Sequence, residues 1–388
     1  MNSKIYNSII ILLISSFGLM AQTKREYERT FEVDKTTQLR FQTRNIDVTF
    51  KTWNKDEVKI DFTVNFKNYS PEDIEKISNE IEVSARIQSS MDDTQYLQIE
   101  NWSPTSIGRL AYTIKLGEIR LDNFLDSSDS KPNKYRSVAN INKEIDAAGK
   151  GWQDMNGFVI FEDSQVALKD LENSNHKGVQ SIRSSYEIYV PKYMEIDIMS
   201  ENASVTFEGI ISNSIRGSFK ESTVKAEELS NEKNMFSFVN GNLKVKKITG
   251  GQLMLRNVTR GLIGEIANIA LETEFSKIDI GEIKENVRFK DFKSKFFFYN
   301  LGSNFKSIDM FCEYSDIKLY TTKNQKFYME AYGNNAILTD GNVKTVVQPS
   351  RDGTKSKILS RGKDDEETRK NFFKLDIVHG FVTFFYNK

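Results

Sequence analysis

Acidic residues recur at a regular spacing in the second half of the chain. Glu228, Lys247, Glu265 and Glu282 follow one another at intervals of 19, 18 and 17 residues. If each interval is one turn of a stacked structure, these side chains lie about 4.8 Å apart on neighbouring strands. Lys247 would then pair with Glu228 and Glu265, and Glu265 beside Glu282 would raise one carboxyl pKa, as a general acid requires. A polysaccharide-processing enzyme fits this pattern, and so does a solvated ladder of charges with no catalysis.

Histidine, cysteine and glycine patterns offer little further chemistry. The two histidines, His176 in NSNHKG and His379 in VHG, have no local serine and aspartate partners for a nucleophile triad. Two histidines and Cys312, the single cysteine, are too scattered for a zinc-ligand pattern. No glycine-rich phosphate loop of the usual spacing occurs. We therefore expect no catalytic residue, no metal site, no cofactor and no enzyme activity.

Aromatic side chains in the segment KSKFFFYN are the better candidates for a binding surface. If the segment is a strand, its first and third phenylalanines point inward, while Phe297 and Tyr299 point outward. Tyr320 occupies the Tyr299 position one repeat later. Phe297, Tyr299 and Tyr320 are therefore the predicted surface-binding strip, able to stack on sugar rings or meet a protein partner. The alternative is that the Phe-rich closing segment 371–387 covers them.

The elements that must position these side chains are short alternating segments that recur from Met194 onward. Each unit contains two predicted strands. We align the units on the first inward-facing residue of the second strand and call this residue the anchor. The anchors are Val205, Val224, Leu243, Gly261, Ile278, Phe296, Ile317 and Ile337. A second apolar residue follows five positions later in six units, at Ile210, Leu229, Ile248, Ile266, Ile283 and Leu301. Stacked units of this kind bury a continuous core that none could form alone. The repeat favours an all-β parallel β-solenoid with rungs of about 19 residues over an antiparallel sandwich or meander, whose strands also recur.

The tripeptide VTF occurs three times, at 48–50, 205–207 and 382–384. The first and last copies lie in LRFQTRNIDVTF and KLDIVHGFVTFF, each of which reads as strand, polar turn, strand. We expect both ends of the chain to be built from the same unit as the middle. Chance is the alternative explanation, because these residue types are favourable in any strand.

The first 21 residues are typical of a secretory signal peptide. Lys4 is the only charge, an apolar run follows, and small residues lead to a cut after Ala21. No membrane-spanning segment follows, so we expect an exported protein of the periplasm or cell surface. With 54 basic and 54 acidic residues the chain has no net charge, which argues against nucleic acid as a partner.

The remaining chain divides by pattern into five parts. Residues 22–125 are rich in strand signals, with a helix near 71–81 that Ser70 caps. Residues 126–182 form an insert with a long polar loop, and 183–345 carry the repeats. We expect 346–371 to be a charged surface loop and 372–388 a closing β-hairpin.

The segments DVTFKTWNKDEVKI and YEIYVPKYMEIDI, followed by a ladder of short strands, resemble a known family. It is the family of adhesin-like envelope proteins, whose shared domain has no assigned function and which is related to the head domain proposed for auto-transporter adhesins. The resemblance covers residues 30–80 and most of 183–345, while the insert at 103–182 is longer than the family pattern. It implies secretion by Gram-negative bacteria, a repetitive all-β fold and no established catalytic residues.

These observations together predict a secreted, non-enzymatic β-repeat protein of the bacterial cell envelope. Its partner would be a glycan or an envelope protein, bound by adhesin-like contacts with the surface or matrix. The alternatives are a polysaccharide-processing β-solenoid enzyme and a structural periplasmic scaffold.

Overall fold

A computed structural model describes most of the chain beyond its first 22 residues. The described residues are 23–44, 46–67, 69–79, 84–90, 94–100, 135–147, 158–161, 164–167, 181–322, 327–361 and 369–387. The expected signal peptide, His176 and most of the 103–182 insert lie outside these ranges.

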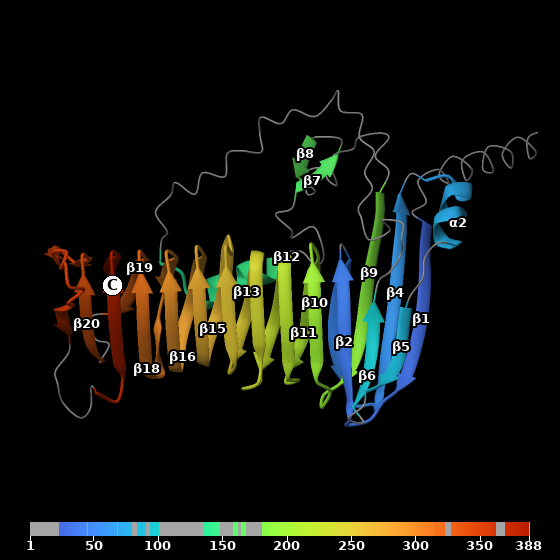
Figure 1. Cartoon of the computed structure of the whole chain (residues 1–388), viewed down its shortest axis with the longest axis horizontal. Coiled ribbons are helices and arrows are strands. Elements are labelled where there is room, and N and C mark those ends of the chain that lie inside the picture. The colour runs from blue at the N-terminus through green and yellow to red at the C-terminus, as the bar shows by residue number, and fades with distance from the viewer. Residues whose placement is uncertain are drawn as a thin grey trace, which may run out of the picture.

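Most described residues lie in strands of one large sheet, which runs along the molecule as two ladders (Figure 1). In spatial order the first ladder contains β5 (Ser84–Ser89), β6 (Gln95–Glu100), β2 (Thr37–Arg44), β10 (Ile196–Glu201), β12 (Ile215–Ser230), β13 (Met235–Thr249), β14 (Gln252–Arg256), β15 (Arg260–Glu274), β16 (Lys277–Phe292), β18 (Leu301–Glu313), β24 (Phe372–Val378), β20 (Tyr328–Asn334) and β23 (Ser356–Arg361).

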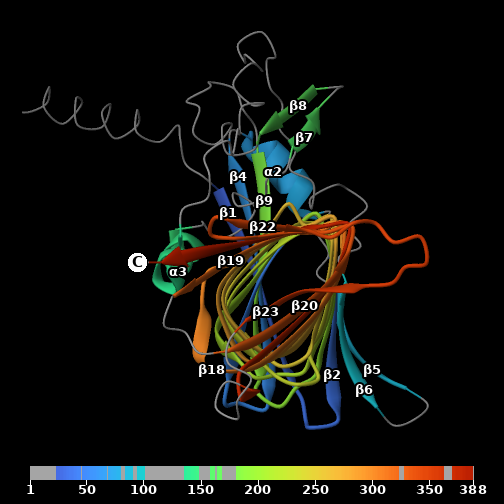
Figure 2. The same ribbon diagram turned by 90° about the vertical axis from the view of Figure 1, so that its left-hand side faces the viewer.

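The second ladder shares the long strands β12, β13, β15 and β16 with the first, because each of them continues around a corner. Its other strands, in chain order, are β1 (Thr23–Glu32), β3 (Asp47–Trp53), β4 (Glu57–Lys67), β9 (Ser181–Pro191), β11 (Ser204–Ile211), β17 (Lys295–Phe298), β19 (Asp316–Thr322), β21 (Ile337–Asp340), β22 (Val343–Val346) and β25 (Phe381–Asn387). Viewed along the stack, the two ladders wind around one interior (Figure 2).

Strand direction separates the middle of the sheet from its ends. Every described pair from β2 and β3 through to β24 and β25 is parallel. The antiparallel pairs of this sheet are β1–β4, β4–β9 and β5–β6 at one end and β20–β23 and β21–β22 at the other. The predicted all-β fold with mostly parallel stacking is therefore confirmed, and the ends differ because an open stack must be covered.

The three VTF copies occupy equivalent positions of the second ladder. Val48, Thr49 and Phe50 of β3 stand in register with Val205, Thr206 and Phe207 of β11. The third copy, on β25, stands in register with Ile317–Leu319 of β19. The rings of Phe50 and Phe207 stack with centroids 5.5 Å apart. Both ends of the chain are thus built from the same unit as the middle, as the repeated phrase predicts.

The predicted register holds through the central rungs. From Val205 to Ile317, each anchor pairs with the next one along the chain. The second apolar column is also right from Leu229 to Leu301. Its first member is wrong, because a bulge after Phe207 shifts the register and places Ile211 opposite Leu229. Ile210 is 65% exposed, and Gly209 at φ +76° supplies the left-handed backbone that the bulge uses.

The C-terminal end corrects three predictions. Residues 372–388 do not form a hairpin: β24 and β25 are consecutive strands of one rung, and each pairs in parallel on both sides. The chain therefore inserts its last rung between β19 and β21, so Ile317 faces Val382 rather than Ile337. The predicted charged loop at 346–371 contains β23, which pairs with β20. Antiparallel strands β22 and β23 then cover the outer edge of the rung formed by β20 and β21.

We call the stack of rungs formed by the two ladders the coil. At one of its corners, residues with positive φ follow one another from rung to rung. These residues are Asn202, Glu221, Asn240, Asn257, Phe275, Lys293, Tyr314, Asn335 and His379, with φ between 49° and 62°. Rungs are joined there by backbone bonds, such as the Phe275 N–H donating to the Phe292 carbonyl at 3.0 Å. Asparagine tolerates this conformation, whereas Phe275 and Tyr314 adopt it at a cost of roughly 1–2 kcal/mol each.

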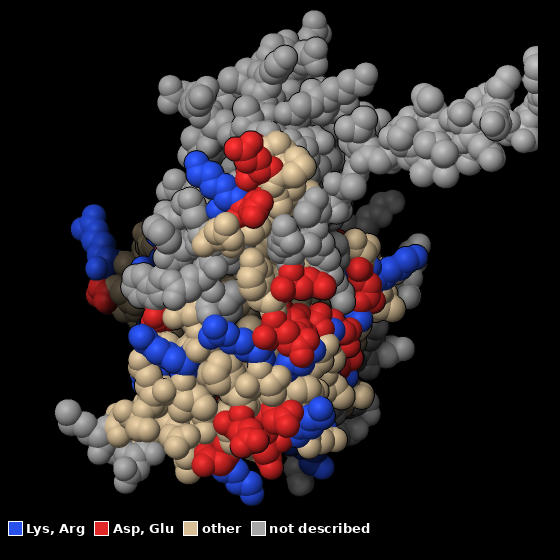
Figure 3. Space-filling view, turned by 90° about the vertical axis from the view of Figure 1, so that its right-hand side faces the viewer, with Lys and Arg blue, Asp and Glu red and all other residues tan. Residues whose placement is uncertain are grey.

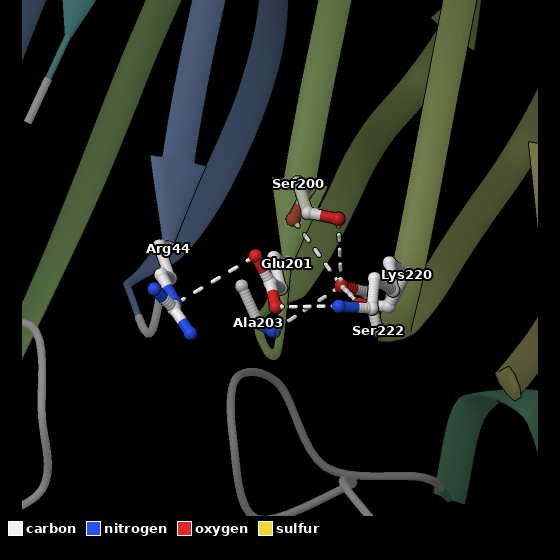
Figure 4. A network of polar contacts seen from close by, with 6 residues as sticks. All are labelled: Arg44, Ser200, Glu201, Ala203, Lys220 and Ser222. Atoms are coloured by element: carbon white, nitrogen blue, oxygen red, sulfur yellow. Dashed lines mark hydrogen bonds and ion pairs between the residues drawn. The ribbon is translucent and has the colours of Figure 1, made fainter. Parts of the chain in front are cut away.

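Polar contacts beside this corner join the first rung to the repeats (Figure 4). Glu201, at the end of β10, pairs with Lys220 at 2.9 Å and with Arg44 of β2 at 3.6 Å. Next to it, the Ser222 hydroxyl lies 3.2 Å from the Ser200 carbonyl. The hydrogen bond from Lys220, followed by the charge of Arg44, lowers the pKa of Glu201 against the opposing effect of burial.

The N-terminal end is closed by β1, β4 and helix α2 (Pro71–Asn79). The Ser70 side chain accepts the Asp73 N–H at 3.1 Å, which confirms the predicted cap, and Ile74 is buried. Lys and Arg side chains lie among Asp and Glu side chains on this end (Figure 3). Lys59, for example, lies 3.2 Å from Glu28 of β1. Charge on an edge strand opposes edge-to-edge association.

Candidate functional site

The predicted binding strip faces outward from the coil, but it is not exposed. Phe297, Tyr299 and Tyr320 form an apolar cluster separate from the main interior, and each is at most 5% exposed. Their rings stack in a row with Phe385 of β25, at centroid distances of 6.4, 5.1 and 4.8 Å. We call these four residues the aromatic row. The prediction that the strip is an open surface is therefore wrong.

Helix α3 (Val138–Ala147) packs over Phe297, Tyr299 and Tyr320, and Tyr135 contacts the two tyrosines. Figure 2 shows the helix against the side of the stacked strands. Residues 138–147 of the 126–182 insert, which is predicted to carry a long polar loop, form this helix. The Ser137 side chain accepts the Asn140 N–H at 3.2 Å and so caps the helix. Ile141 and Ile145, one helical turn apart, are fully buried against the row. The cover therefore comes mainly from the insert, and the closing segment that the sequence suggested contributes Phe385, which stacks on Tyr320.

Two glycines let the helix approach the coil closely. A Cβ at Gly264 would lie 2.1 Å from Asn142 Oδ1 of α3. A Cβ at Gly281, one rung further, would lie 3.2 Å from both Val138 Cα and Ile141 Cδ1. A Cβ at Gly264 would also lie 2.4 Å from the Lys246 carbonyl oxygen, so a larger residue there would clash with both α3 and the neighbouring rung.

Charged pairs surround this apolar contact. Asp146 of α3 lies 2.5 Å from Lys246, and Glu144 pairs with Arg260 and Arg136. Beneath the helix, the Tyr299 hydroxyl donates to Asp279 at 2.7 Å. Burial, followed by the charge of Asp279, raises the pKa of Tyr299 far above its ordinary range, so this hydroxyl stays a donor.

The predicted carboxylate column exists with the expected register. Glu228, Lys247, Glu265 and Glu282 are direct neighbours on successive rungs. Lys247 binds Glu228 at 2.8 Å, while Lys284 lies 2.8 Å from Glu265 and 2.9 Å from Glu282. Burial alone would lower the pKa of Lys284, but its hydrogen bonds and charge interactions with both glutamates raise it. Lys284 is therefore a cation placed between the two neighbouring carboxylates.

His379 and Cys312 are the histidine and the cysteine within the described residues, since His176 lies outside them. His379 stacks on Tyr314, with ring centroids 4.8 Å apart, and its Nδ1 lies 2.6 Å from Asn335 Nδ2. Burial raises the pKa of Cys312 far above its ordinary range, so its thiol is unreactive. Within the described ranges, no three His, Cys, Asp or Glu side chains are grouped as metal ligands.

An open groove lies on the outer face of the first ladder, which the sequence analysis did not consider. Its apolar members are Val239, Met254, Phe292 and Phe311, each 37–38% exposed. The groove has a volume of about 410 Å³. Its charged and polar lining includes Ser237, Arg256, Glu272, Glu274, Lys290 and Glu313. We call this the outer-face groove.

Aromatic rings extend the groove to the positive-φ corner. Phe275 and Tyr314 are 49% and 50% exposed, and both contact Phe292, at centroid distances of 5.5 and 5.8 Å. Arg256 and Glu274 pair at 2.8 Å beside them. Such an exposed cluster of aromatic, Met and Arg side chains has the composition of an interaction surface.

Alternation in the first strand of each unit would have identified part of this groove. Phe292 and Phe311 fall at outward positions of β16 and β18, where a strand that serves only the core carries polar residues. Phe275 and Tyr314 give no such signal, because their exposure depends on the corner conformation.

Comparison with known proteins assigns no family. No family model matches the chain, and no curated protein matches it. One solved structure, described as a "putative cell adhesion protein" from Clostridium sporogenes ATCC 15579, is 10% identical, and the match covers 93% of this chain and 99% of that one. Its TM-score is 0.19. At that score the likeness carries no argument, and the adhesin-like resemblance of the sequence stays a prediction.

Proposed function

We propose that this chain is an exported, non-enzymatic β-solenoid protein of the bacterial cell envelope that binds a partner through the outer-face groove. The observation that carries the proposal is the continuous exposed surface of Phe275, Phe292, Phe311, Tyr314 and Met254. A partner that covers these side chains would gain roughly 25 cal/mol of binding free energy for each Å² of apolar surface removed from water.

The partner class that suits this surface is a glycan or an envelope protein. Aromatic rings bind sugar faces and protein side chains equally well, while the alternating charges of Arg256, Glu272, Glu274 and Lys290 favour no strongly charged polymer. Among the described residues, no helix has the length and apolar character needed to cross a bilayer.

A polysaccharide-processing activity has less support. Glu265 and Glu282 are the carboxylates that such an activity would use, and both are bound to Lys284. A purely structural role remains the second alternative, and it predicts no ligand at the groove.

Binding of purified protein to a glycan array and to immobilised envelope fractions tests the proposal. The variant Phe292→Ala/Phe311→Ala should lose most of the binding, because it removes the centre of the groove. Ile210→Ala is the matched control, since it removes an exposed apolar side chain elsewhere and should bind normally. Unchanged binding by the double variant would exclude the groove, and release of sugar fragments that depends on Glu265 would favour the enzyme.

A further inference from the structure

The aromatic row is a second apolar site on the coil that has to be covered. Phe297, Tyr299 and Tyr320 belong to a cluster with Leu262 on the outer surface, apart from the main interior. Within the described ranges α3, Tyr135 and the Lys318 side chain lie over it, Lys318 at 4.9 Å from the centre of the Phe297 ring, and the Phe385 end of the row is 38% exposed. The coil therefore carries a docking surface for a helix.

The surface is complementary to α3 in shape and in charge. The helix presents Ile141 and Ile145 to the row, and its backbone fits the space left by Gly264 and Gly281. Two coil cations, Lys246 and Arg260, face Asp146 and Glu144 of α3, and one coil anion, Asp279, faces Arg136 just before the helix.

Chain length allows α3 to reach more than one such surface. The helix is separated from β6 by residues 101–137, which number 37 and span at most roughly 130 Å when fully extended. The contacts of α3 would be the same on a second copy of the chain as on its own coil. Exchange of an identical element between copies is a low-cost route to a dimer.

We propose that the aromatic row is a helix-docking surface whose occupant, α3, exchanges between copies of this chain and links them into a dimer. In one chain the covalent connection gives α3 a high effective concentration, so the monomer dominates in dilute solution. Crowding of copies on a cell surface shifts occupancy toward the neighbouring copy. The proposal is independent of the outer-face groove, which lies on the other ladder.

Complementary variants test the exchange in the full-length mature chain. Ile141→Asp/Ile145→Asp lacks a competent helix but keeps the surface, and Leu262→Asp/Phe297→Asp lacks the surface but keeps the helix. Each alone should be monomeric by size-exclusion chromatography with light scattering, while their mixture should give a one-to-one heterodimer. The mixture should dimerise at least tenfold more readily than the wild type, because no helix in it can bind its own coil.

A labelled peptide of residues 135–147 provides the second measurement. Its fluorescence anisotropy should rise with the Ile141→Asp/Ile145→Asp variant and stay low with the Leu262→Asp/Phe297→Asp variant. If the mixture stays monomeric at the highest soluble concentration, the exchange is refuted, whether or not the peptide binds. Should circular dichroism show that either double variant is unfolded, Ile145→Ala and Leu262→Ala replace them, with the same two outcomes. If the mixture of the two double variants stays monomeric but still binds envelope fractions, the exchange of α3 is refuted. The proposed binding function of the outer-face groove is then unaffected.

Discussion

Replacing Ile141 by alanine should release α3 without unfolding the coil. Ile141 is fully buried, and truncation of a buried isoleucine to alanine costs about 2–5 kcal/mol. Its contacts belong to the cluster outside the main interior, so this cost falls on the docking of the helix. The equilibrium between docked and released α3 should then shift by roughly 30- to 4,000-fold toward release.

Amide hydrogen exchange, read separately for α3 and for the coil strands, measures this shift. Amides of residues 141–147 should exchange faster by the same factor, up to the rate of an unstructured peptide, while amides of β13 and β15 keep their protection. Ile266→Ala is the matched control, because Ile266 is equally buried but faces the main interior. Ile266→Ala should lower the free energy of unfolding of the whole coil. The amides of α3 should then lose no more protection from exchange than the amides of the strands around it. Equal loss of protection throughout the Ile141→Ala protein would refute the separation of the two clusters.

The remaining predictions concern register and charge. Urea denaturation should show a loss of about 2–5 kcal/mol for Ile211→Ala and less than about 0.5 kcal/mol for Ile210→Ala, because the bulge buries the first and exposes the second; equal losses would contradict the bulge. Lys284→Gln should be less stable than the wild type at neutral pH, and because the folded protein raises the pKa of Lys284, the difference should shrink only as the pH rises past its ordinary 10.5. A difference that is constant from pH 7 to 11.5 would argue against the bridge. Folding lowers the pKa of Glu201, so this residue contributes to the free energy of unfolding above its ordinary pKa of 4.5, and the contribution is lost as the pH falls through the folded value. The stability of Glu201→Gln should therefore approach that of the wild type in acid. A difference in unfolding free energy that persists at pH 2 would contradict this prediction.

Local alternation explains why much of the register was predictable. In a strand the side-chain period is two, so the inward position of Val205, Val224 or Ile278 follows from its neighbours. Stacking identical units then fixes which residues meet, which is why Glu265 and Glu282 were correctly placed side by side. The failure at Ile210 has a local cause, because one extra residue in a bulge reverses the faces of everything after it.

The candidate sites could not be derived in the same way. Alternation correctly turned Phe297, Tyr299 and Tyr320 away from the interior, but outward is not the same as exposed. Their cover comes from α3, more than 100 residues earlier in the chain, and its two buried isoleucines resemble those of any short amphipathic helix. The outer-face groove lies on the first strand of each unit, whereas the anchor residues that define the repeat lie on the second.

The sequence by itself determined a repeating all-β chain, the spacing of its rungs, the inward face of each strand and the equivalence of the three VTF segments. These properties depend on backbone periodicity and on the burial of alternate side chains, which neighbouring residues decide. Only the tertiary structure decided that the last rung enters between β19 and β21, that α3 covers the aromatic row, and that Phe292 and Phe311 stay open. Those outcomes depend on which distant segments reach the same surface, and no local pattern carries that information.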